Sequence, residues 1–227
     1  MKIEILGTGG AYSPELGNTS FLIWDGKESS AILMDCGYTV FPTLLALERK
    51  TGRKIISKIK TIFISHMHAD HAGSLGTLLQ YIYYTQKRSV KIAGAPIKSF
   101  LRQVIPCEYN KVIHETDKSI KLLSTEHDAK MLSYGAYVNG VLYSGDSKNS
   151  LLNTTEAKKA LIILHEVALP PKHVHTLLDE LAATNPSLRA KTWLTHYSSS
   201  DSQYLRKAVQ KHGFGGLLRK GQILQRD

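Results

Sequence analysis

The amino-acid sequence predicts an α/β protein in which two β-sheets pack together and helices cover their outer faces. Short apolar runs that end in turn residues cluster in the first and last parts of the chain, and segments with helical spacing follow each cluster. No linker, low-complexity segment or short-period repeat interrupts the 227 residues. We therefore expect one α/β domain that spans residues 1–227.

The predicted strands are apolar runs bounded by turn residues. They cover residues 2–6, 21–24, 31–34, 61–65, 90–93, 120–123, 133–139, 141–143, 161–164 and 192–194. Two pairs of these runs predict hairpins, because Asp25-Gly26 and Asn139-Gly140 are dipeptides that suit a tight chain reversal. The predicted helices have apolar residues recurring on one face, or follow a proline. They cover residues 41–49, 73–86, 97–104, 174–181 and 202–212.

Composition limits the class of protein. Hydrophobic residues make up 42% and charged residues 21%, which excludes disordered and fibrous chains. No apolar run approaches the ~18 residues that a membrane-spanning helix needs, so no membrane partner is expected. The two cysteines, Cys36 and Cys107, are too few for a disulfide scaffold. We expect free thiols, with one bridge as the alternative, and a cytoplasmic location, which is the host cytoplasm if a phage encodes the chain.

The charge balance indicates the partners. The formal net charge is +10, which favours anionic partners such as nucleic acid, nucleotides or acidic lipid. The basic residues are scattered and form no run of five or six, so no dedicated nucleic-acid-binding arm is predicted. Composition does not locate the charge, and both a generally cationic surface and a focused anion site remain open.

Three histidines and one aspartate lie close together in the run His66-Met67-His68-Ala69-Asp70-His71. The preceding run predicts a buried strand, so His66 lies at its carboxyl end. His66 and His68 are two residues apart and point to one side of an extended segment. Asp70 and His71 precede the predicted helix, where the chain turns, so the cluster can face two adjacent metal positions. Imidazole nitrogens and carboxylate oxygens suit Zn²⁺, Mn²⁺ or Fe²⁺ better than Mg²⁺ or Ca²⁺.

Further candidate ligands follow later strands. They are His127, Asp146 and His196, each placed after a predicted strand. Because the ends of several strands of one sheet meet at one edge, we expect these side chains to converge. For any one of them alone, a hydrogen-bonded histidine or a turn aspartate is the simpler interpretation. Together with the histidine cluster they predict a shared metal centre.

The run HMHADH, followed by His127, Asp146 and His196, resembles the metallo-β-lactamase fold family. The likeness extends from Leu6-Gly7-Thr8-Gly9-Gly10 to His196. The resemblance implies a four-layer αββα sandwich with a centre of two divalent transition metals, zinc or alternatively manganese, at one edge. It implies the following ligands: His66, His68 and His127 on one metal, Asp70, His71 and His196 on the other, and Asp146 between them.

Residues outside the ligand set resemble the RNase Z-like phosphodiesterase branch of that family. Gly7-Thr8-Gly9 followed by Asn18-Thr19-Ser20 resembles its opening, and Asp146 replaces the Cys of the true β-lactamases. Glu166 resembles the strand-end Glu of the branch, and His175 its downstream His, with His173 as the rival. The resemblance implies that His175, oriented by Glu166, protonates the leaving ribose oxygen. The nucleophile would be a metal-bound hydroxide, which Asp70 helps to orient.

Two phosphodiester substrates compete. The sequence between His71 and His127 contains no Gly/Pro-rich arm of the kind that grips tRNA, and the segments His175-Thr176 and 191–197 resemble the compact cyclic-nucleotide phosphodiesterases, which include anti-Pycsar enzymes. This resemblance implies hydrolysis of 3′,5′-cyclic nucleotides to linear nucleoside monophosphates, by a homodimer. The alternatives are tRNA 3′-processing, with RNA as the partner, and a metal-bearing module that binds nucleic acid without cutting it.

Three residues are weaker candidates for substrate contacts. Ser198 either contacts phosphate or belongs to the N-cap region of the helix predicted at 202–212. Tyr134 and Tyr137 either stack on a base or are half-buried strand residues. Cys36 is predicted to be a buried turn thiol rather than a nucleophile, since no His neighbours it in the sequence.

Overall fold

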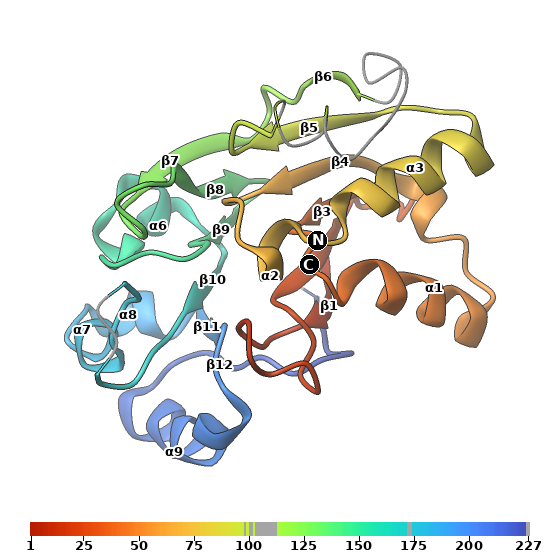
Figure 1. The fold of residues 1–227 in the computed structure, drawn as a ribbon. Coiled ribbons are helices and arrows are strands. Elements are labelled where there is room, and N and C mark those ends of the chain that lie inside the picture. The colour runs from red at the N-terminus through yellow and green to blue at the C-terminus, as the bar shows by residue number, and fades with distance from the viewer. Residues whose placement is uncertain (98, 100–101, 103–112, 172–173, 226–227) are drawn as a thin grey trace.

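A computed structural model describes residues 1–227 except 98, 100–101, 103–112, 172–173 and 226–227. The predicted α/β architecture is confirmed. Two mixed β-sheets pack face to face, and helices lie on the outer side of each sheet (Figure 1). None of the helices in the described part of the chain combines the length and the apolar character needed to span a lipid bilayer.

The first sheet is built mainly from the first half of the chain. Its strands are β1 (Lys2–Gly7), β2 (Ser20–Trp24), β3 (Ala31–Met34), β4 (Ile59–Ile64), β5 (Val90–Gly94), β6 (Ile113–Thr116) and β13 (Ile223–Gln225). Among the described residues the order is β13-β1-β2-β3-β4-β5-β6, with β3 to β6 parallel. Strands β2 and β3 form the predicted hairpin. Strand β13 pairs with β1, so the first and last strands of the chain lie side by side (Figure 1).

The second sheet comes from the second half of the chain. Its strands are β7 (Lys121–Thr125), β8 (Ser133–Val138), β9 (Val141–Tyr143), β10 (Ile162–Glu166), β11 (Thr192–Thr195) and β12 (Gly216–Leu217). The order is β12-β11-β10-β9-β8-β7, with β9 to β12 parallel and β7 to β9 antiparallel. The predicted turn between β8 and β9 has positive φ at both Asn139 and Gly140, as a tight hairpin of this kind requires.

Alternation along the strands divides the apolar side chains among three cores. Phe21 of β2 packs between the two sheets, and its neighbour Leu22 packs against the helices outside the first sheet. In β10, Leu164 joins the core between the sheets, whereas Ile163 packs against the helices outside the second sheet. Because successive side chains of a strand point to opposite faces, apolar residues at every position bury both faces of each sheet. The result is the four-layer αββα sandwich.

The helices agree in part with those predicted from the sequence. They are α1 (Val40–Thr51), α2 (Ala69–Ala72), α3 (Leu75–Gln86), α6 (Thr155–Lys159), α7 (Leu178–Ala182), α8 (Pro186–Arg189) and α9 (Ser202–His212), with short turns η1 (Ile56–Lys58), η2 (Leu151–Asn153) and η3 (Ser199–Asp201). The helix predicted at 73–86 begins two residues later, and α2 precedes it. The prediction of a helix at 174–181 was wrong for residues 174–177, and the helix begins at Leu178. Leu177 is extended and forms a β-bridge with Ala168. Most of the helix predicted at 97–104 lies outside the described residues, as does Cys107.

Candidate metal centre

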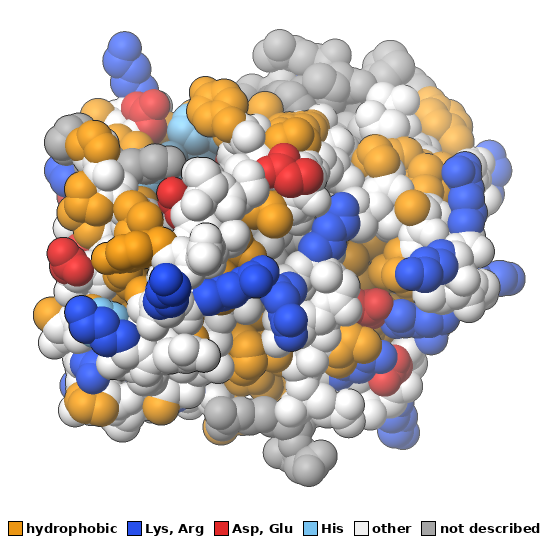
Figure 2. All heavy atoms as spheres, turned by 90° about the horizontal axis from the view of Figure 1, so that it is seen from below, with side chains coloured by type: hydrophobic (Ala, Val, Ile, Leu, Met, Phe, Trp, Pro, Cys, Tyr) orange, Lys and Arg blue, Asp and Glu red, His pale blue; other side chains and the backbone are white. Residues whose placement is uncertain are grey.

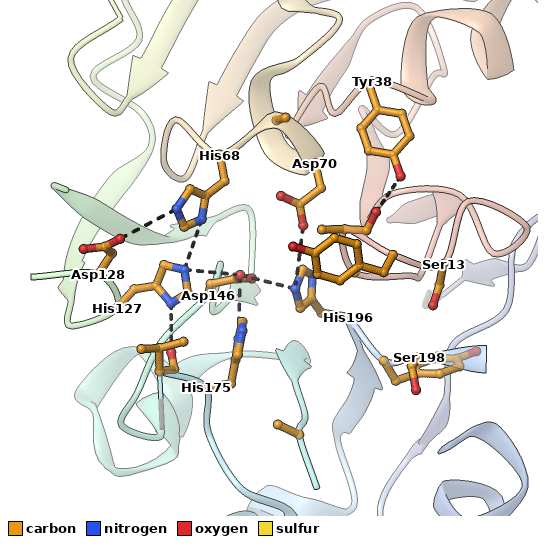
Figure 3. Close-up of a pocket in the computed structure, with 17 residues that line it drawn as sticks. Ser13, Tyr38, His68, Asp70, His127, Asp128, Asp146, His175, His196 and Ser198 are labelled. Carbon is orange, nitrogen blue, oxygen red and sulfur yellow. Dashed lines mark hydrogen bonds and ion pairs between the residues drawn. The ribbon is translucent and has the colours of Figure 1, made fainter. Parts of the chain in front are cut away.

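The carboxyl ends of β4, β7, β9 and β11 lie at one edge of the sandwich, and the structure brings the seven predicted ligand side chains together there. Figure 3 shows His68, Asp70, His127, Asp146 and His196 of this set. His66 and His68 follow β4, His127 follows β7, and Asp146 and His196 follow β9 and β11. Asp70 and His71 are carried by α2 rather than by the chain before a helix, so the turn of α2 aims both side chains into the same site. Residues from both sheets therefore form one site.

The first group of ligand atoms contains three imidazole nitrogens. His66 Nε2 lies 2.9 Å from His68 Nδ1, and His68 Nδ1 lies 3.3 Å from His127 Nε2. A tetrahedral zinc ion with bonds of roughly 2.0–2.1 Å holds its ligands about 3.3 Å apart. The spacing of these three atoms therefore fits one metal position.

The second group of ligand atoms adds carboxylates. Asp70 Oδ2 lies 3.5 Å from His71 Nε2 and 3.9 Å from His196 Nε2. Asp146 faces both groups: its Oδ1 lies 3.3 Å from His71 Nε2, and its Oδ2 lies 3.2 Å from His196 Nε2 and 3.7 Å from His127 Nε2. This places Asp146 where a carboxylate can bridge two cations.

Two of the candidate ligand atoms have no hydrogen-bond partner in the described part of the chain. His71 Nε2 and Asp146 Oδ1 are buried, and neither has a hydrogen-bond partner among the described residues. Buried polar atoms are nearly always paired, because an unpaired one costs its full desolvation free energy. Within each group the ligand atoms all lie within 4.8 Å of one another. The donor set and the two unpaired atoms therefore fit divalent metal ions.

The protonation states favour cation binding. Burial lowers the pKa of His66 to about 2 and that of His196 to about 4, so both imidazoles are neutral near pH 7 and offer a lone pair. Burial alone would raise the pKa of Asp146, but His196 and His71 outweigh it and hold that pKa well below its usual value. At His71 burial lowers the pKa, yet the carboxylates of Asp146 and Asp35 outweigh it and raise the pKa. Positive charge is thus favoured at this position.

Hydrogen bonds on the far side of the rings orient the ligands. His66 Nδ1 lies 3.0 Å from Ser65 Oγ, His71 Nδ1 lies 2.8 Å from Asp35 Oδ2, and His127 Nδ1 lies 2.8 Å from a main-chain oxygen. When Nδ1 carries the proton, Nε2 is left as the donor atom for a metal. Asp35 and His196 both have positive φ, at 57° and 58°, a strained backbone that proteins retain mainly at functional sites.

Glu166 and His175 form a hydrogen-bonded pair beside the ligands. Glu166 Oε2 lies 2.6 Å from His175 Nδ1, and its other oxygen accepts from the main-chain nitrogen of Ser147. Burial and the charge of Asp146 raise the pKa of Glu166 to about 7. The chain bends at residues 174–175, where a helix was predicted, and this bend carries His175 past the end of β10. Its rival His173 lies outside the described residues.

A pocket of about 550 Å³ opens over this edge. Among its lining residues are Tyr12, Ser13, Tyr38, Asp128, His175 and Ser198. Ser198, which was predicted to contact substrate, therefore lies at the pocket. Tyr134 and Tyr137 do not line the pocket: Tyr134 packs against the core between the sheets and Tyr137 against the core outside the second sheet.

A family profile described as anti-Pycsar protein Apyc1 matches the chain in two overlapping segments, residues 1–101 and 93–224. The chain belongs to the anti-Pycsar Apyc1 family. The anti-Pycsar protein Apyc1 of Paenibacillus harenae is 29% identical over 231 residues, which cover 90% of this chain and 92% of the relative. Ribonuclease Z of Methanococcus aeolicus is 31% identical over 156 residues, which cover 61% of this chain and 43% of that protein.

Solved structures confirm the fold of this Apyc1 family member. The metallo-β-lactamase fold protein YhfI from Bacillus subtilis superposes with a TM-score of 0.76 at 18% identity, covering 98% of each chain. The predicted resemblance to this fold family is therefore confirmed. The family profile confirms the predicted anti-Pycsar branch.

Several residues at or beside the site of this Apyc1 family member were not predicted from its sequence. Asp35 follows a predicted strand directly, so the strand-end rule that selected Asp146 could have selected it too. Tyr12 is 98% exposed, and it follows the glycine-rich turn after β1. Tyr38 reaches Ala11 through a hydrogen bond of 2.6 Å from its hydroxyl. No local pattern marked these tyrosines as residues of a pocket.

Proposed function

We propose that this member of the anti-Pycsar Apyc1 family is a metal-dependent phosphodiesterase that hydrolyses 3′,5′-cyclic nucleotides to linear nucleoside monophosphates. The supporting observation is that Asp146 faces both groups of ligand atoms beside the Glu166–His175 pair, and that Asp146, His175 and ligands of each group line one pocket. At about 550 Å³ the pocket is within the usual range for small-molecule sites. The family membership supports the cyclic nucleotide over other phosphodiesters.

We propose that the centre holds two divalent metals, zinc or alternatively manganese. The ligands would be His66, His68 and His127 for one, Asp70, His71 and His196 for the other, and Asp146 for both. Bound metals of this kind acidify water and neutralise charge on a phosphate oxygen. Asp70 also lines the pocket, so its carboxylate is placed to accept a hydrogen bond from the attacking water and orient it.

His175 supplies the proton that the departing ribose oxygen needs. Because Glu166 binds its Nδ1, the nitrogen available to a substrate is Nε2. The ring lines the pocket and its side chain is 17% exposed, so it can reach a bound nucleotide. Glu166 acts through His175 and keeps the ring oriented. General acid catalysis of this kind contributes about 10²- to 10⁴-fold in rate.

Residues at the mouth of the pocket bind the rest of the nucleotide. The exposed ring of Tyr12 offers a face for stacking on the base, in place of Tyr134 and Tyr137. Ser198 lines the same mouth and contributes a hydroxyl for the phosphate or the ribose. We assign the choice of substrate to these residues at the mouth and metal binding to the ligands beneath them.

The alternative function is cleavage of precursor tRNA. The net charge of +10 favours it, and Figure 2 shows a face on which Lys and Arg outnumber Asp and Glu. On that face the basic side chains are spread out rather than gathered at one place. Such a distribution attracts polyanions in general and selects no particular RNA.

The deciding experiment supplies the purified protein with Zn²⁺ or Mn²⁺ and offers it the common 3′,5′-cyclic mononucleotides and a precursor tRNA in parallel. We expect ring opening of cyclic nucleotides and intact tRNA. Cleavage of tRNA alone would reverse the assignment, and no cleavage of either would favour a non-catalytic binding module. Light scattering of the same preparation tests the proposed homodimer.

A further inference from the structure

None of the described residues that line the pocket is Lys or Arg, although the chain has 29 of these residues. When bound, the metals supply positive charge, but a phosphate also has oxygens that need hydrogen-bond donors. Two tyrosine hydroxyls of the lining are committed elsewhere: Tyr38 donates to the main-chain oxygen of Ala11, and Tyr197 to that of Leu218. Main-chain N–H groups are the alternative source of donors.

The loop after β1 has three such groups in succession. The main-chain nitrogen of Ser13 donates to the Gly10 carbonyl at 3.3 Å, which closes a turn. No hydrogen bond among the described residues has the main-chain nitrogen of Gly10, Ala11 or Tyr12 as its donor. All three residues line the pocket. The turn at residues 10–13 therefore leaves successive N–H groups for water or a ligand.

The geometry of this turn places two donors in parallel. Neither Ala11 nor Tyr12 has a positive φ, which excludes types II, I′ and II′ and leaves type I for a hydrogen-bonded turn. Because the central residues of a type I turn have near-helical dihedral angles, their N–H bonds point in nearly the same direction, back toward Gly10. A Cβ added to Gly10 would lie only 3.3 Å from His196 Nε2. The turn therefore presents two parallel donors beside the metal centre.

Contacts on both sides hold the turn in place. The Tyr38 hydroxyl donates to the Ala11 carbonyl at 2.6 Å (Figure 3), and Ser13 Oγ accepts from the main-chain nitrogen of Ser199 at 3.3 Å. At the start of the turn, Gly9 forms β-bridges with segments from both halves of the chain. Donors that are fixed before a substrate binds need no reorganisation, and this makes them effective at stabilising negative charge.

We propose that the turn at residues 10–13 is a phosphate subsite, in which the main-chain N–H groups of Ala11 and Tyr12 bind a nonbridging oxygen of the substrate phosphate. The proposal rests on the phosphodiesterase function proposed above and adds main-chain donors to it. It leaves the ring of Tyr12 for the base. Its consequence is that a backbone change at Ala11, which alters no polar side chain, weakens phosphate binding.

The first test needs no variant. The ¹⁵N-labelled protein is loaded with zinc and titrated with inorganic phosphate while its amide signals are followed by NMR. We expect the amide protons of Ala11 and Tyr12 to move downfield together, because a hydrogen bond to an anion deshields the proton. Phosphate that moves the signals of Ala69 and Asp70 at the start of α2 instead would overturn the subsite, as would a protein that binds no phosphate.

The second test removes one donor. Ala11→Pro deletes the N–H of residue 11 and keeps the carbonyl that accepts from Tyr38, and proline is favoured at the second position of a type I turn. We expect the affinity for phosphate and kcat/KM for cyclic nucleotides to fall about 10- to 150-fold, the effect of one hydrogen bond to a charged group. Zinc content should stay at the wild-type value, and the melting temperature should stay equal or rise.

The matched control is Gly26→Pro. Gly26 holds the same position in a turn closed by a hydrogen bond of 3.0 Å from Glu28 to Asp25, has open space around it and does not line the pocket. It should leave phosphate affinity and rate at the wild-type values. Wild-type phosphate affinity in Ala11→Pro would overturn the subsite, and if that variant does not fold, the NMR titration decides. Shifted amides in a wild type that opens no cyclic nucleotide would overturn the proposed function and leave the subsite standing.

Discussion

The floor and the mouth of the pocket are built differently. The floor includes Asp146 and His196, and directly beneath it His66 and His71 are fully buried, with their rings held by Ser65 and Asp35. At the mouth, the side chain of Asp128 is 47% exposed and Tyr12 is 98% exposed. Packed groups with several hydrogen bonds hold one geometry, whereas exposed loop residues adjust to a ligand. We infer that the floor determines metal binding and that the mouth determines which substrate is accepted.

The largest expected effect tests the floor. Asp146→Ala removes the carboxylate that faces both groups of ligands, so turnover should be abolished and metal content lowered, as measured by elemental analysis of the purified protein. Asp128→Ala is the matched change at the mouth and should retain both metals. An Asp146→Ala protein with full metal content and full rate would contradict the bridging role.

The next effect separates proton donation from metal binding. His175→Ala should keep the metals and slow hydrolysis of cyclic nucleotides by about 10²- to 10⁴-fold. Hydrolysis of an aryl phosphodiester should slow far less, because its acidic leaving group departs without a proton. The comparison of kcat for the two substrates is the measurement. Equal slowing of both would remove His175 from the acid role.

The mouth is tested by Tyr12→Ala. Loss of one stacking face costs about 1–3 kcal/mol, which corresponds to a rise in KM of roughly 5- to 150-fold at unchanged kcat. Tyr204→Ala is the control, since Tyr204 is 58% exposed and lies on α9 without lining the pocket. A Tyr12→Ala protein with the KM of the wild type would show that the base binds elsewhere.

The floor should also make the metal-free protein sensitive to acid. The pKa of His196 is lowered by burial from 6.5 to about 4, so the unfolded state binds this proton first as the pH falls. Stability should therefore decrease between pH 6.5 and about 4, and His66 contributes in the same direction. The pKa of His71 is raised, so its contribution is lost only above pH 6.5 and does not oppose this trend. Melting temperatures should depend less steeply on pH in His196→Asn.

The smallest effect is expected behind the floor. Burial raises the pKa of Cys36 to about 12, so its sulfur stays a thiol and not a nucleophile. Its Sγ lies 3.4 Å from Ser74 Oγ, and a serine hydroxyl can make the same contact. Cys36→Ser should therefore keep nearly the full rate of cyclic nucleotide hydrolysis. An inactive protein with a native circular dichroism spectrum would contradict this.

The metal-ligand candidates and most strands were accessible from local sequence patterns. His66 and His68 were found because two residues of spacing in an extended segment put two side chains on one side. His127, Asp146 and His196 were found because they follow apolar runs, and the ends of neighbouring strands share an edge. These rules depend only on the backbone geometry of a few consecutive residues, so they can be applied to the sequence before the fold is known.

Other parts of the centre depend on how the two sheets meet. The bond from Tyr143 to Asp35 joins residues 108 positions apart, and no spacing rule relates them. Strand β13 is only three residues long and is stabilised by pairing with β1 at the other end of the chain. His175 reaches Glu166 because the chain bends at residues 174–175, where the local pattern favoured a helix. Long-range packing and hydrogen bonds outweigh weak local preferences, so only the folded chain reveals these contacts.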